Sequence, residues 1–501
     1  MPFTPEQQAA IDARNPMLLV SAAAGSGKTA VLVQRVLSLI RQDGVSVSRM
    51  LIVTFTRAAA AEMRDRLQHQ LAELGESDTR LRREAALVET AQISTIHAFC
   101  HALVQEFFPL VDVDPEAQLM QPAQRQELLT QALDDAVTES YEHPSEDMRR
   151  LQENFSDAQI VDMVSSLYDF LLARPDPFAW LHGFAQKQYT AADLTQGALG
   201  AELLQSARLR LEGAQGFLGE ALRLLDDPYL HDKYKEDIRA DEKYLAALLA
   251  AATDGEALLS AARAGGFKTL SRVKLAEADE LRSKARFTAL RDEYKALVKE
   301  AVSLFPADPA KAARDLESMQ PCLRALETLC LSLHERFQQD KREKGLLDFG
   351  DVEHMALSIL RDAVAGPQIA ARYDALFVDE SQDVSGLQEA LLSALYGRVR
   401  TSFLVGDVKQ SIYRFRLAEP SLFLSKLETY GDAETAEKRR ILLNRNFRSR
   451  ENVLASVNYV FRRVMRREST EIEYDDGAAL WPGLPSRGDP TTELHALPAA
   501  P

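Results

Sequence analysis

The chain has 501 residues, a formal net charge of −16 and an apolar content of 46%. This length allows about two to four domains with cores of their own. The acidic balance excludes a protein that coats nucleic acid by bulk charge, because phosphate neutralisation requires concentrated lysine and arginine. The N-terminus lacks the pattern of a signal peptide, and no stretch approaches the roughly 20 apolar residues of a membrane span. We therefore expect a soluble cytoplasmic protein that makes no membrane contact.

The three cysteines, Cys100, Cys322 and Cys330, carry little functional information. They have neither the spacing of a metal site nor the even number of a disulfide framework. We expect buried thiols in a reducing compartment.

Near the N-terminus, short apolar runs alternate with helical patterns. Strands are predicted at 17–21, 50–55 and 91–95, and helices at 31–40, at 57–74 and from about His97 onward. Such alternation is typical of a parallel sheet with helices on its faces. Further apolar runs at 375–378, 401–405 and 440–443 end in polar residues and continue the same pattern.

Residues 109–344 interrupt this pattern. They are rich in Ala, Leu, Glu and Arg, and the apolar residues of 203–225 recur at three-four spacing, which predicts a helical insertion. Residues 481–501 contain proline and glycine but no predicted closing helix or strand. We expect from this ending that the chain is truncated.

The residues after the first strand match a phosphate-binding loop. The loop consists of Ala22, Ala23, Ala24, Gly25, Ser26, Gly27, Lys28 and Thr29, with Ala22 where the first glycine is usual. Glycines let backbone N–H groups turn toward phosphate oxygens, and the start of the following helix adds its positive dipole end. Lys28 would reach the β and γ phosphates and Thr29 would bind Mg²⁺. A structural turn is the alternative, but the strand before and the helix after favour nucleotide binding.

Two adjacent carboxylates, Asp379 and Glu380, follow the apolar run 376–378. Burial there would cost several kcal/mol unless something pairs with them, and Mg²⁺ with a nucleophilic water would do so. Asp379 would hold the metal through its water shell, and Glu380 would accept the proton of the attacking water. A solvated acidic turn is the alternative, but the phosphate loop in the same chain favours ATP hydrolysis.

Four motifs together resemble those of the UvrD-like superfamily-one DNA helicases. They are the phosphate loop, Asp-Glu-Ser-Gln-Asp at 379–383, the run 405–416, and Asn-Phe-Arg-Ser at 446–449. The runs 344–349, 415–423 and 471–480 resemble AddA, the helicase-nuclease subunit of bacterial AddAB. The resemblance covers nearly the whole chain outside the insertion.

The resemblance implies an α/β fold of the P-loop NTPase (RecA-like) type, with helices on both faces of a parallel sheet. A first lobe would comprise residues 1–108 and 345–432, separated by the helical insertion 109–344, and residues 433–501 would begin a second RecA-like lobe.

The implied activity is that of an ATP- and Mg²⁺-dependent 3′–5′ DNA helicase or translocase. It would act on single- and double-stranded DNA in double-strand-break repair and recombination, as a heterodimer with an AddB-type partner. One alternative is a stand-alone helicase of the UvrD, PcrA or Rep kind. Another is an ATP- and DNA-binding module without translocation, because no second arginine of a second lobe is found before Pro501. Exonuclease activity is expected only of the full-length protein.

The resemblance also assigns residues around the nucleotide. Gln7 would read the edge of adenine, and Phe447 would stack on it. Gln410 would touch the γ phosphate as a sensor, and Arg448 would extend to it across the cleft. With Lys28, Asp379 and Glu380, these last two complete the expected catalytic set. Ala30 stands where some relatives have a basic residue that stacks on adenine.

Aromatic and polar residues are assigned to DNA. Tyr413 and Phe415 alternate along a segment expected to be extended, which would set both rings on one face, where they would stack on bases. Phe55 would stack at another strand end. Thr56, Thr95 and His97 would contact backbone phosphates, although His97 alone also reads as a structural histidine. Such contacts carry no sequence preference and suit a motor.

Overall fold

The structure is a computed structural model, and it describes residues 2–484. These residues form two compact units. The first comprises 2–182, 325–467 and 471–484, and the second comprises 183–324 and 468–470. Within 2–484, no helix combines the length and hydrophobicity that crossing a bilayer requires.

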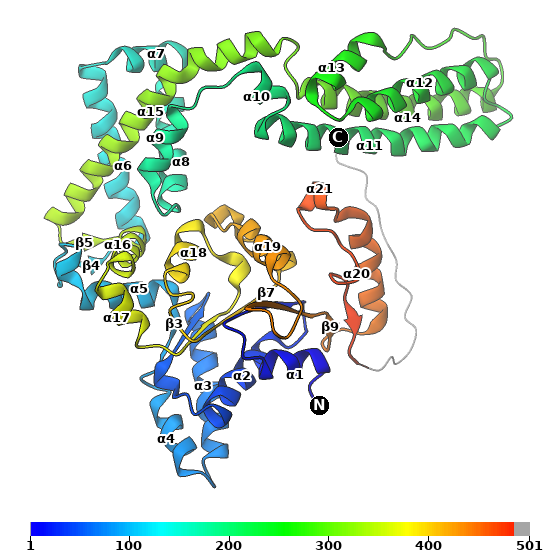
Figure 1. Cartoon of the computed structure of the whole chain (residues 1–501). Coiled ribbons are helices and arrows are strands. Elements are labelled where there is room, and N and C mark those ends of the chain that lie inside the picture. Colours follow the sequence, from blue (N-terminus) through cyan, green and yellow to red (C-terminus); the bar gives the residue numbers. More distant parts are fainter. Residues whose placement is uncertain (1, 485–501) are drawn as a thin grey trace. The chain divides into compact units, whose positions relative to one another are not determined.

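A six-stranded parallel sheet forms the centre of the first unit (Figure 1). Its strands are β1 Met17–Ala22, β2 Met50–Thr54, β3 Gln92–Thr95, β6 Ala375–Val378, β7 Thr401–Gly406 and β8 Lys438–Leu443, in the order β3-β2-β6-β7-β1-β8. Because every pair is parallel, the carboxyl ends of all the strands lie along one edge of the sheet.

The helices of the first unit are α1 Pro5–Asp12, α2 Lys28–Gln42, α3 Arg57–Leu74, α4 Thr79–Leu87, α5 Ile96–Glu106, α6 Pro122–Glu142, α7 Glu146–Asn154, α8 Asp157–Leu172, α16 Phe349–Arg361, α17 Ala365–Ala370, α18 Gly386–Ser393, α19 Pro420–Thr429 and α20 Glu451–Val464. The second unit contains α10 Ala191–Thr195, α11 Ala198–Arg223, α12 Asp232–Ala251, α13 Gly255–Ala264 and α14 Ala278–Ser303. Three helices, α9 Pro177–Ala185, α15 Pro309–Glu343 and α21 Arg467–Thr470, contain residues of both units. Two small ladders pair β4 Gln118–Leu119 with β5 Leu346–Leu347, and β9 Arg445–Asn446 with β10 Trp481–Pro482.

Side chains of the strands alternate between two hydrophobic layers. Leu18 and Val20 of β1 face the layer that contains α1, α2, α3 and α4. Leu19 faces the opposite layer, with α5, α16, α18 and α19. A sheet covered on both faces requires apolar residues at every strand position, which is why these strands read as short continuous apolar runs.

The strand β8 corrects the predicted domain division at residue 433. It pairs with β1 along its whole length, from Lys438 opposite Met17 to Leu443 opposite Ala22. This strand is therefore the edge of the first sheet and does not begin a second lobe. The apolar pattern of 440–443 indicates this continuation correctly; a second lobe after β8 stays a prediction.

The segment 109–344 is mainly helical, as predicted, but it divides between the units. Residues 109–182 and 325–344 group with the sheet, and residues 183–324 group separately. In the separate unit, α11 buries one face made of Ala207, Leu211, Ala214 and Leu218. The three-four spacing seen in the sequence is the signature of that face.

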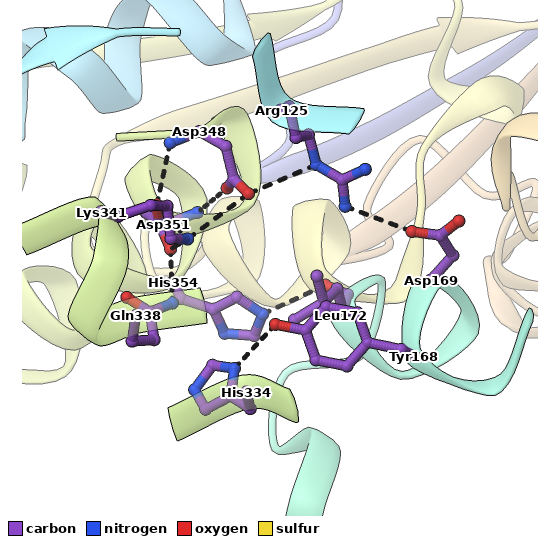
Figure 2. A network of polar contacts seen from close by, with 10 residues as sticks. All are labelled: Arg125, Tyr168, Asp169, Leu172, His334, Gln338, Lys341, Asp348, Asp351 and His354. Carbon is purple, nitrogen blue, oxygen red and sulfur yellow. Dashed lines mark hydrogen bonds and ion pairs between the residues drawn. The ribbon is translucent and has the colours of Figure 1, made fainter. Parts of the chain in front are cut away.

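A buried polar network fixes the first turn of α16 (Figure 2). Asp348 caps this helix and accepts a hydrogen bond from the Asp351 N–H at 2.8 Å, while the Asp351 carboxylate accepts one from the Asp348 N–H at 2.8 Å. Lys341 of α15, 2% exposed, lies 2.6 Å from Asp351. Arg125 of α6 lies 3.3 Å from Asp348 and 3.2 Å from Asp169 of α8, and it thereby connects the two carboxylates. Four helices thus meet at one set of charges, each of which is paired.

His334 of α15 lies beside this network and makes the stability of the protein pH-dependent. Its Nδ1 is 2.9 Å from the Tyr168 hydroxyl, and burial together with nearby Lys341 lowers the pKa of His334 to about 4. An unfolded histidine takes up its proton near pH 6.5, so the unfolded state binds more protons between these two values. The free energy of unfolding contributed by this group is complete above about pH 6.5 and is lost as the pH falls toward about 4.

The free energy of unfolding of the wild type should fall between about pH 7 and about pH 4.5. We expect His334→Gln to make that fall smaller by about 2 kcal/mol. Glutamine keeps a polar partner for Tyr168 but does not titrate. Urea unfolding at the two pH values measures the difference. The exposed His143, changed to Gln, is the control and should behave as the wild type. If the free energy of unfolding of His334→Gln falls between the two pH values by as much as that of the wild type, the prediction is refuted.

Candidate active site

The loop between β1 and α2 has the backbone shape of a phosphate cradle. Gly25 and Gly27 have φ values of 69° and 82°, in the left-handed region that glycine adopts without strain. Gly27 caps α2 without a side-chain hydrogen bond, so the first N–H groups of the helix are left for another acceptor. Among residues 2–484, the buried Ser26 hydroxyl finds no hydrogen-bond partner. The loop therefore offers several inward-facing donors to an anion.

Ala22 occupies the position where the loop pattern usually has its first glycine. It is the last residue of β1 and is fully buried, with its methyl group in the hydrophobic core. The N–H of the next residue, Ala23, donates to the Leu443 carbonyl of β8 at 2.8 Å. The loop thus turns only after Ala22, which explains why this position accepts a side chain.

Three of the predicted catalytic side chains meet beyond the strand ends. Lys28 Nζ lies 2.8 Å from Glu380 Oε2 and 3.5 Å from Gln410 Oε1. Lys28 opens α2, Glu380 follows β6, and Gln410 ends the short 3-10 helix η5 Val408–Gln410 after β7. In this structure Lys28 therefore neutralises Glu380.

Asp379 and Glu380 have different environments although they are neighbours. Glu380 has φ 50°, an unusual conformation for a residue other than glycine, and such residues cost about 1–3 kcal/mol where they occur. Its N–H donates to Asp379 Oδ1 at 3.0 Å. Burial, and then the charge of Glu380, raise the pKa of Asp379 to about 6. Carboxylate and hydroxyl oxygens are ligands that Mg²⁺ prefers, so the side chains of Asp379 and Thr29 fit the chemistry of the predicted metal site, which stays a prediction.

Two residues that the sequence analysis did not single out, Gln382 and Asp407, connect β6 to β7. The Gln382 amide donates to Glu380 at 3.0 Å and to Asp383 at 2.8 Å, and its oxygen accepts from the Asp407 N–H at 3.0 Å. Asp407 in turn accepts from the Gln410 amide at 2.7 Å. Glu380 and Gln410 are thereby held by one chain of hydrogen bonds. The sequence signal for both residues was their place in the motifs 379–383 and 405–416, directly after apolar strands.

Asn446 belongs to the motif 446–449, but the sequence analysis assigned it no role of its own. Its Nδ2 donates to the Ala24 carbonyl at 2.7 Å, and its Oδ1 accepts from the Arg448 N–H at 2.8 Å. The Phe447 N–H also donates to the Gly25 carbonyl, at 2.9 Å. A Cβ at Gly25 would lie 2.7 Å from Asn446 Nδ2 and 3.0 Å from Arg448 Cβ, so glycine is required for this close approach. The predicted residues Phe447 and Arg448 are thus attached to the phosphate loop.

Gln7 and Phe447, the two residues assigned to adenine, line one small hollow with Thr4, Glu6, Ser26, Leu443, Asn444 and Arg445. The buried Gln7 amide donates to the Ser26 carbonyl at 2.8 Å, and its oxygen accepts from the Thr4 N–H at 2.9 Å. In this structure Gln7 therefore supports the phosphate loop, with one amide hydrogen still available.

The aromatic residues assigned to DNA gather as three neighbouring rings. The ring centres of Phe55 and Tyr413 are 4.7 Å apart, and those of Tyr413 and Phe415 are 5.8 Å apart. The prediction that this segment is extended is wrong, because Arg414–Arg416 form the 3-10 helix η6. The rings come together through this tight turn instead of by strand alternation. The guanidinium of Arg416 lies over both Tyr413 and Phe415.

Thr56, Thr95 and His97, assigned to backbone phosphates, already have partners within the protein. Thr56 and Thr95 cap α3 and α5, and their hydroxyl oxygens accept from backbone N–H groups at 3.1 and 3.3 Å. Each hydroxyl hydrogen remains available for donation. His97 Nε2 lies 3.3 Å from Glu353 Oε1.

One cavity of about 380 Å³ connects the two sets of residues. It is lined by Phe55, Thr56 and His97 as well as by Asp379 and Glu380. The strand order explains this arrangement. Phe55 follows β2, His97 lies just after β3 and Asp379 follows β6, and β2 lies between β3 and β6 in the sheet.

Residues 3–431 match the model of the UvrD/REP helicase N-terminal domain. The chain belongs to this family. Its six-stranded parallel sheet and phosphate loop confirm the predicted RecA-like α/β fold class for the UvrD/REP domain.

Curated relatives of this UvrD/REP-family chain are named as the A subunit of an ATP-dependent helicase/nuclease, which confirms the resemblance to AddA. The relative from Syntrophomonas wolfei is 38% identical over 96% of this chain and 40% of its own length. Those from Alkaliphilus metalliredigens and Bacillus licheniformis are 36% and 35% identical, each over 99% of this chain and 42% of their own length. The chain thus spans about two fifths of these relatives.

Proposed function

We propose that this chain is the N-terminal motor part of an AddA-type enzyme, an ATP-dependent DNA helicase or translocase that moves 3′ to 5′. The observation that carries this proposal is the meeting of Lys28, Glu380 and Gln410 at one edge of the sheet. Only two residues separate Gln410 from Tyr413 of the aromatic cluster. A hydrolysis site and a base-stacking surface are therefore joined by a few residues of the same segment.

In the proposed mechanism, the phosphate groups of ATP are held by the N–H groups of residues 25–29 and by Lys28. The adenine would lie against Gln7 and Phe447, whose side chains line the same small hollow. Thr29 and Asp379 would hold Mg²⁺, which when bound neutralises charge on the β and γ phosphates. These assignments rest on the shape of the loop and on the chemistry of the side chains.

The ion pair between Lys28 and Glu380 gives this site an off state. While the Lys28 ammonium group lies 2.8 Å from Glu380 Oε2, that oxygen already has a partner and is not free to contact the attacking water. A phosphate that attracts Lys28 releases Glu380, which then orients a water and accepts its proton. Gln382 restrains Glu380 through its amide, so the carboxylate stays near its position when Lys28 leaves.

Movement along DNA would follow from the connection between Gln410 and the aromatic rings. A change at Gln410, on loss of the γ phosphate, would be transmitted through the two residues after η5 to Tyr413 and Phe415. Bases would stack on these rings and on Phe55, a contact that tolerates any sequence. For the whole protein, we further propose an AddB-type partner and a role in double-strand-break repair.

Tyr413→Ala tests the proposed function. Loss of a stacking ring is expected to weaken binding of a single-stranded oligonucleotide by about 1 to 3 kcal/mol, which is about 5- to 150-fold. Stimulation of ATP hydrolysis by DNA should fall in parallel, while hydrolysis without DNA is retained. Fluorescence anisotropy and phosphate release measure the two effects.

Tyr229→Ala is the matched control, because Tyr229 is exposed and lies in the second compact unit. It should bind DNA like the wild type. The proposal fails if the wild-type chain does not bind single-stranded DNA, or if Tyr413→Ala binds it as tightly as the wild type.

A further inference from the structure

A second cavity, of about 290 Å³, adjoins the one that connects the hydrolysis site to the aromatic cluster. Its walls are the C-terminal end of α8, the residues from Arg414 to the start of α19, and Glu471. Ala173 and Leu417 line both cavities, and all of these residues belong to the first compact unit. The second cavity therefore continues the surface that begins at the aromatic cluster.

Phe170 of α8 provides an aromatic surface in the second cavity. The guanidinium of Arg174 lies 4.4 Å from its ring centre, and the Trp180 ring packs edge-on against it with ring centres 5.4 Å apart. On the same helix, the Tyr168 hydroxyl and the Leu172 carbonyl contact α15 and α16 (Figure 2). Phe170 is nevertheless 37% exposed. The ring is thus held in place and partly open, as a platform for base stacking requires.

Arg414 supplies the positive charge of this cavity. It begins η6, and its guanidinium donates a hydrogen bond to the Glu471 carboxylate at 2.7 Å. The two side chains are 62% and 49% exposed, and an ion pair in such a position contributes little to stability. Because the guanidinium fork fits a phosphate as well as a carboxylate, Arg414 can exchange Glu471 for a phosphate at a small cost.

The charges of the second cavity favour a nucleotide of a strand over a free anion. Two carboxylates, Glu419 and Glu471, line it together with one cation, Arg414. This surplus of negative charge repels a free phosphate or an acidic peptide. A nucleobase is neutral, stacks on an aromatic ring and has N–H groups that can donate to carboxylates.

Leu417 stands between the two cavities in a conformation that is unusual for leucine. Its φ is 61°, and its N–H donates to the Arg414 carbonyl at 2.9 Å. Residues in such conformations persist only where the surrounding structure holds them, and they are frequent at ligand contacts. The turn places Arg416 in the first cavity and Arg414 in the second. One segment therefore contributes an arginine to each cavity.

We propose that Phe170 and Arg414 form a further site for single-stranded DNA, in which a base stacks on Phe170 and a phosphate replaces Glu471 at Arg414. This inference rests on the DNA-binding function proposed above. The bound strand runs from the aromatic cluster past Leu417 into the second cavity. Glu471 acts as a competitor that occupies Arg414 when no DNA is bound.

The dependence of affinity on oligonucleotide length tests the stacking contact. Oligothymidylates of about 4 to about 16 nucleotides cover the site sizes of base-stacking grooves. For the wild type, we expect affinity to rise at the length that reaches the second cavity. Phe170→Leu keeps an apolar side chain but no ring, so it should bind long strands about 5- to 150-fold more weakly and short strands like the wild type. Phe170→Tyr keeps the ring and should show the full rise.

Substitutions on each side of the ion pair test the competition between Glu471 and phosphate. Glu471→Gln should raise the affinity for long strands about two- to fivefold, the scale of an exposed ion pair. Arg414→Gln should make the slope of log affinity against log salt concentration smaller by about 0.7, the share of one phosphate contact. In the Arg414→Gln background, Glu471→Gln should give no gain.

Glu473→Gln is the matched control for Glu471→Gln. Glu473 is an exposed glutamate in the same segment, and its carboxylate accepts a hydrogen bond from the Arg467 N–H at 3.2 Å. The substitution removes the same charge without releasing Arg414, so the affinity should equal that of the wild type.

The inference is overturned if Phe170→Leu weakens binding by one factor at every length, the result expected of a merely structural ring, or if it weakens binding at no length. It is also overturned if Glu471→Gln lowers the affinity, or raises it equally with and without Arg414. In each of these cases, a loss in Tyr413→Ala leaves the proposed function standing. A wild-type chain that binds no single-stranded DNA would refute both.

Discussion

Lys28→Ala is expected to abolish ATP hydrolysis and leave the fold intact. The change removes the cation assigned to the β and γ phosphates, and loss of one such preorganised electrostatic contact costs about 100- to 1,000-fold in rate. It also leaves Glu380 without its ion-pair partner, but that carboxylate is 35% exposed and keeps its hydrogen bond from Gln382. Phosphate release in the presence of single-stranded DNA measures the effect, and circular dichroism checks the fold.

The control for this variant is Lys243→Ala, because Lys243 is an exposed residue of α12 in the second compact unit. Its hydrolysis rate should equal that of the wild type. Turnover at the wild-type rate in Lys28→Ala would mean that the loop after β1 is a structural turn.

Glu380→Gln is expected to separate ATP binding from ATP hydrolysis. Glutamine has the same size and can still contact Gln382, but it cannot accept the proton of the attacking water, which costs about 100- to 10,000-fold in rate. ATP should bind at least as tightly as to the wild type, because Lys28 no longer has a carboxylate that competes with the phosphates. Single-turnover hydrolysis and equilibrium binding of labelled ATP measure the two steps.

Glu236→Gln provides the comparison, since Glu236 is an exposed glutamate on α12. Equal loss of binding and hydrolysis in Glu380→Gln would argue for a structural role of this carboxylate. Retention of full hydrolysis would assign the proton acceptor to another residue.

Local patterns in the sequence determined much of the fold. The helix predicted at 57–74 is α3, with the same limits, and the predicted strands match β1, β2, β3, β6, β7 and β8 to within a residue or two. These elements are recognisable because a strand covered on both faces must be apolar throughout and because phosphate loops have a narrow residue pattern. The motifs at 22–29 and 379–383 resembled those of UvrD-like helicases together with the runs 405–416 and 446–449.

The limits of the units could not be predicted in this way. The division of the helical insertion at residues 182 and 325 depends on which helices pack against the sheet, and apolar residues at helical spacing do not specify the packing partner. The place of β8 at the edge of the first sheet depends on its pairing with β1, more than 400 positions away in sequence. The turn at Arg414–Arg416 depends on packing that alternation of aromatic residues does not specify.

The sequence by itself determined the phosphate loop, the adjacent carboxylates after β6 and the family, because each of these is written in consecutive residues. Only the tertiary structure decided that Lys28 pairs with Glu380, that Gln382 and Asp407 join the ends of β6 and β7, that Asn446 holds the phosphate loop, and that Glu353 faces His97. These contacts join positions far apart in the chain. Their physical cause is the order of parallel strands, which brings the carboxyl ends of the sheet together at one edge.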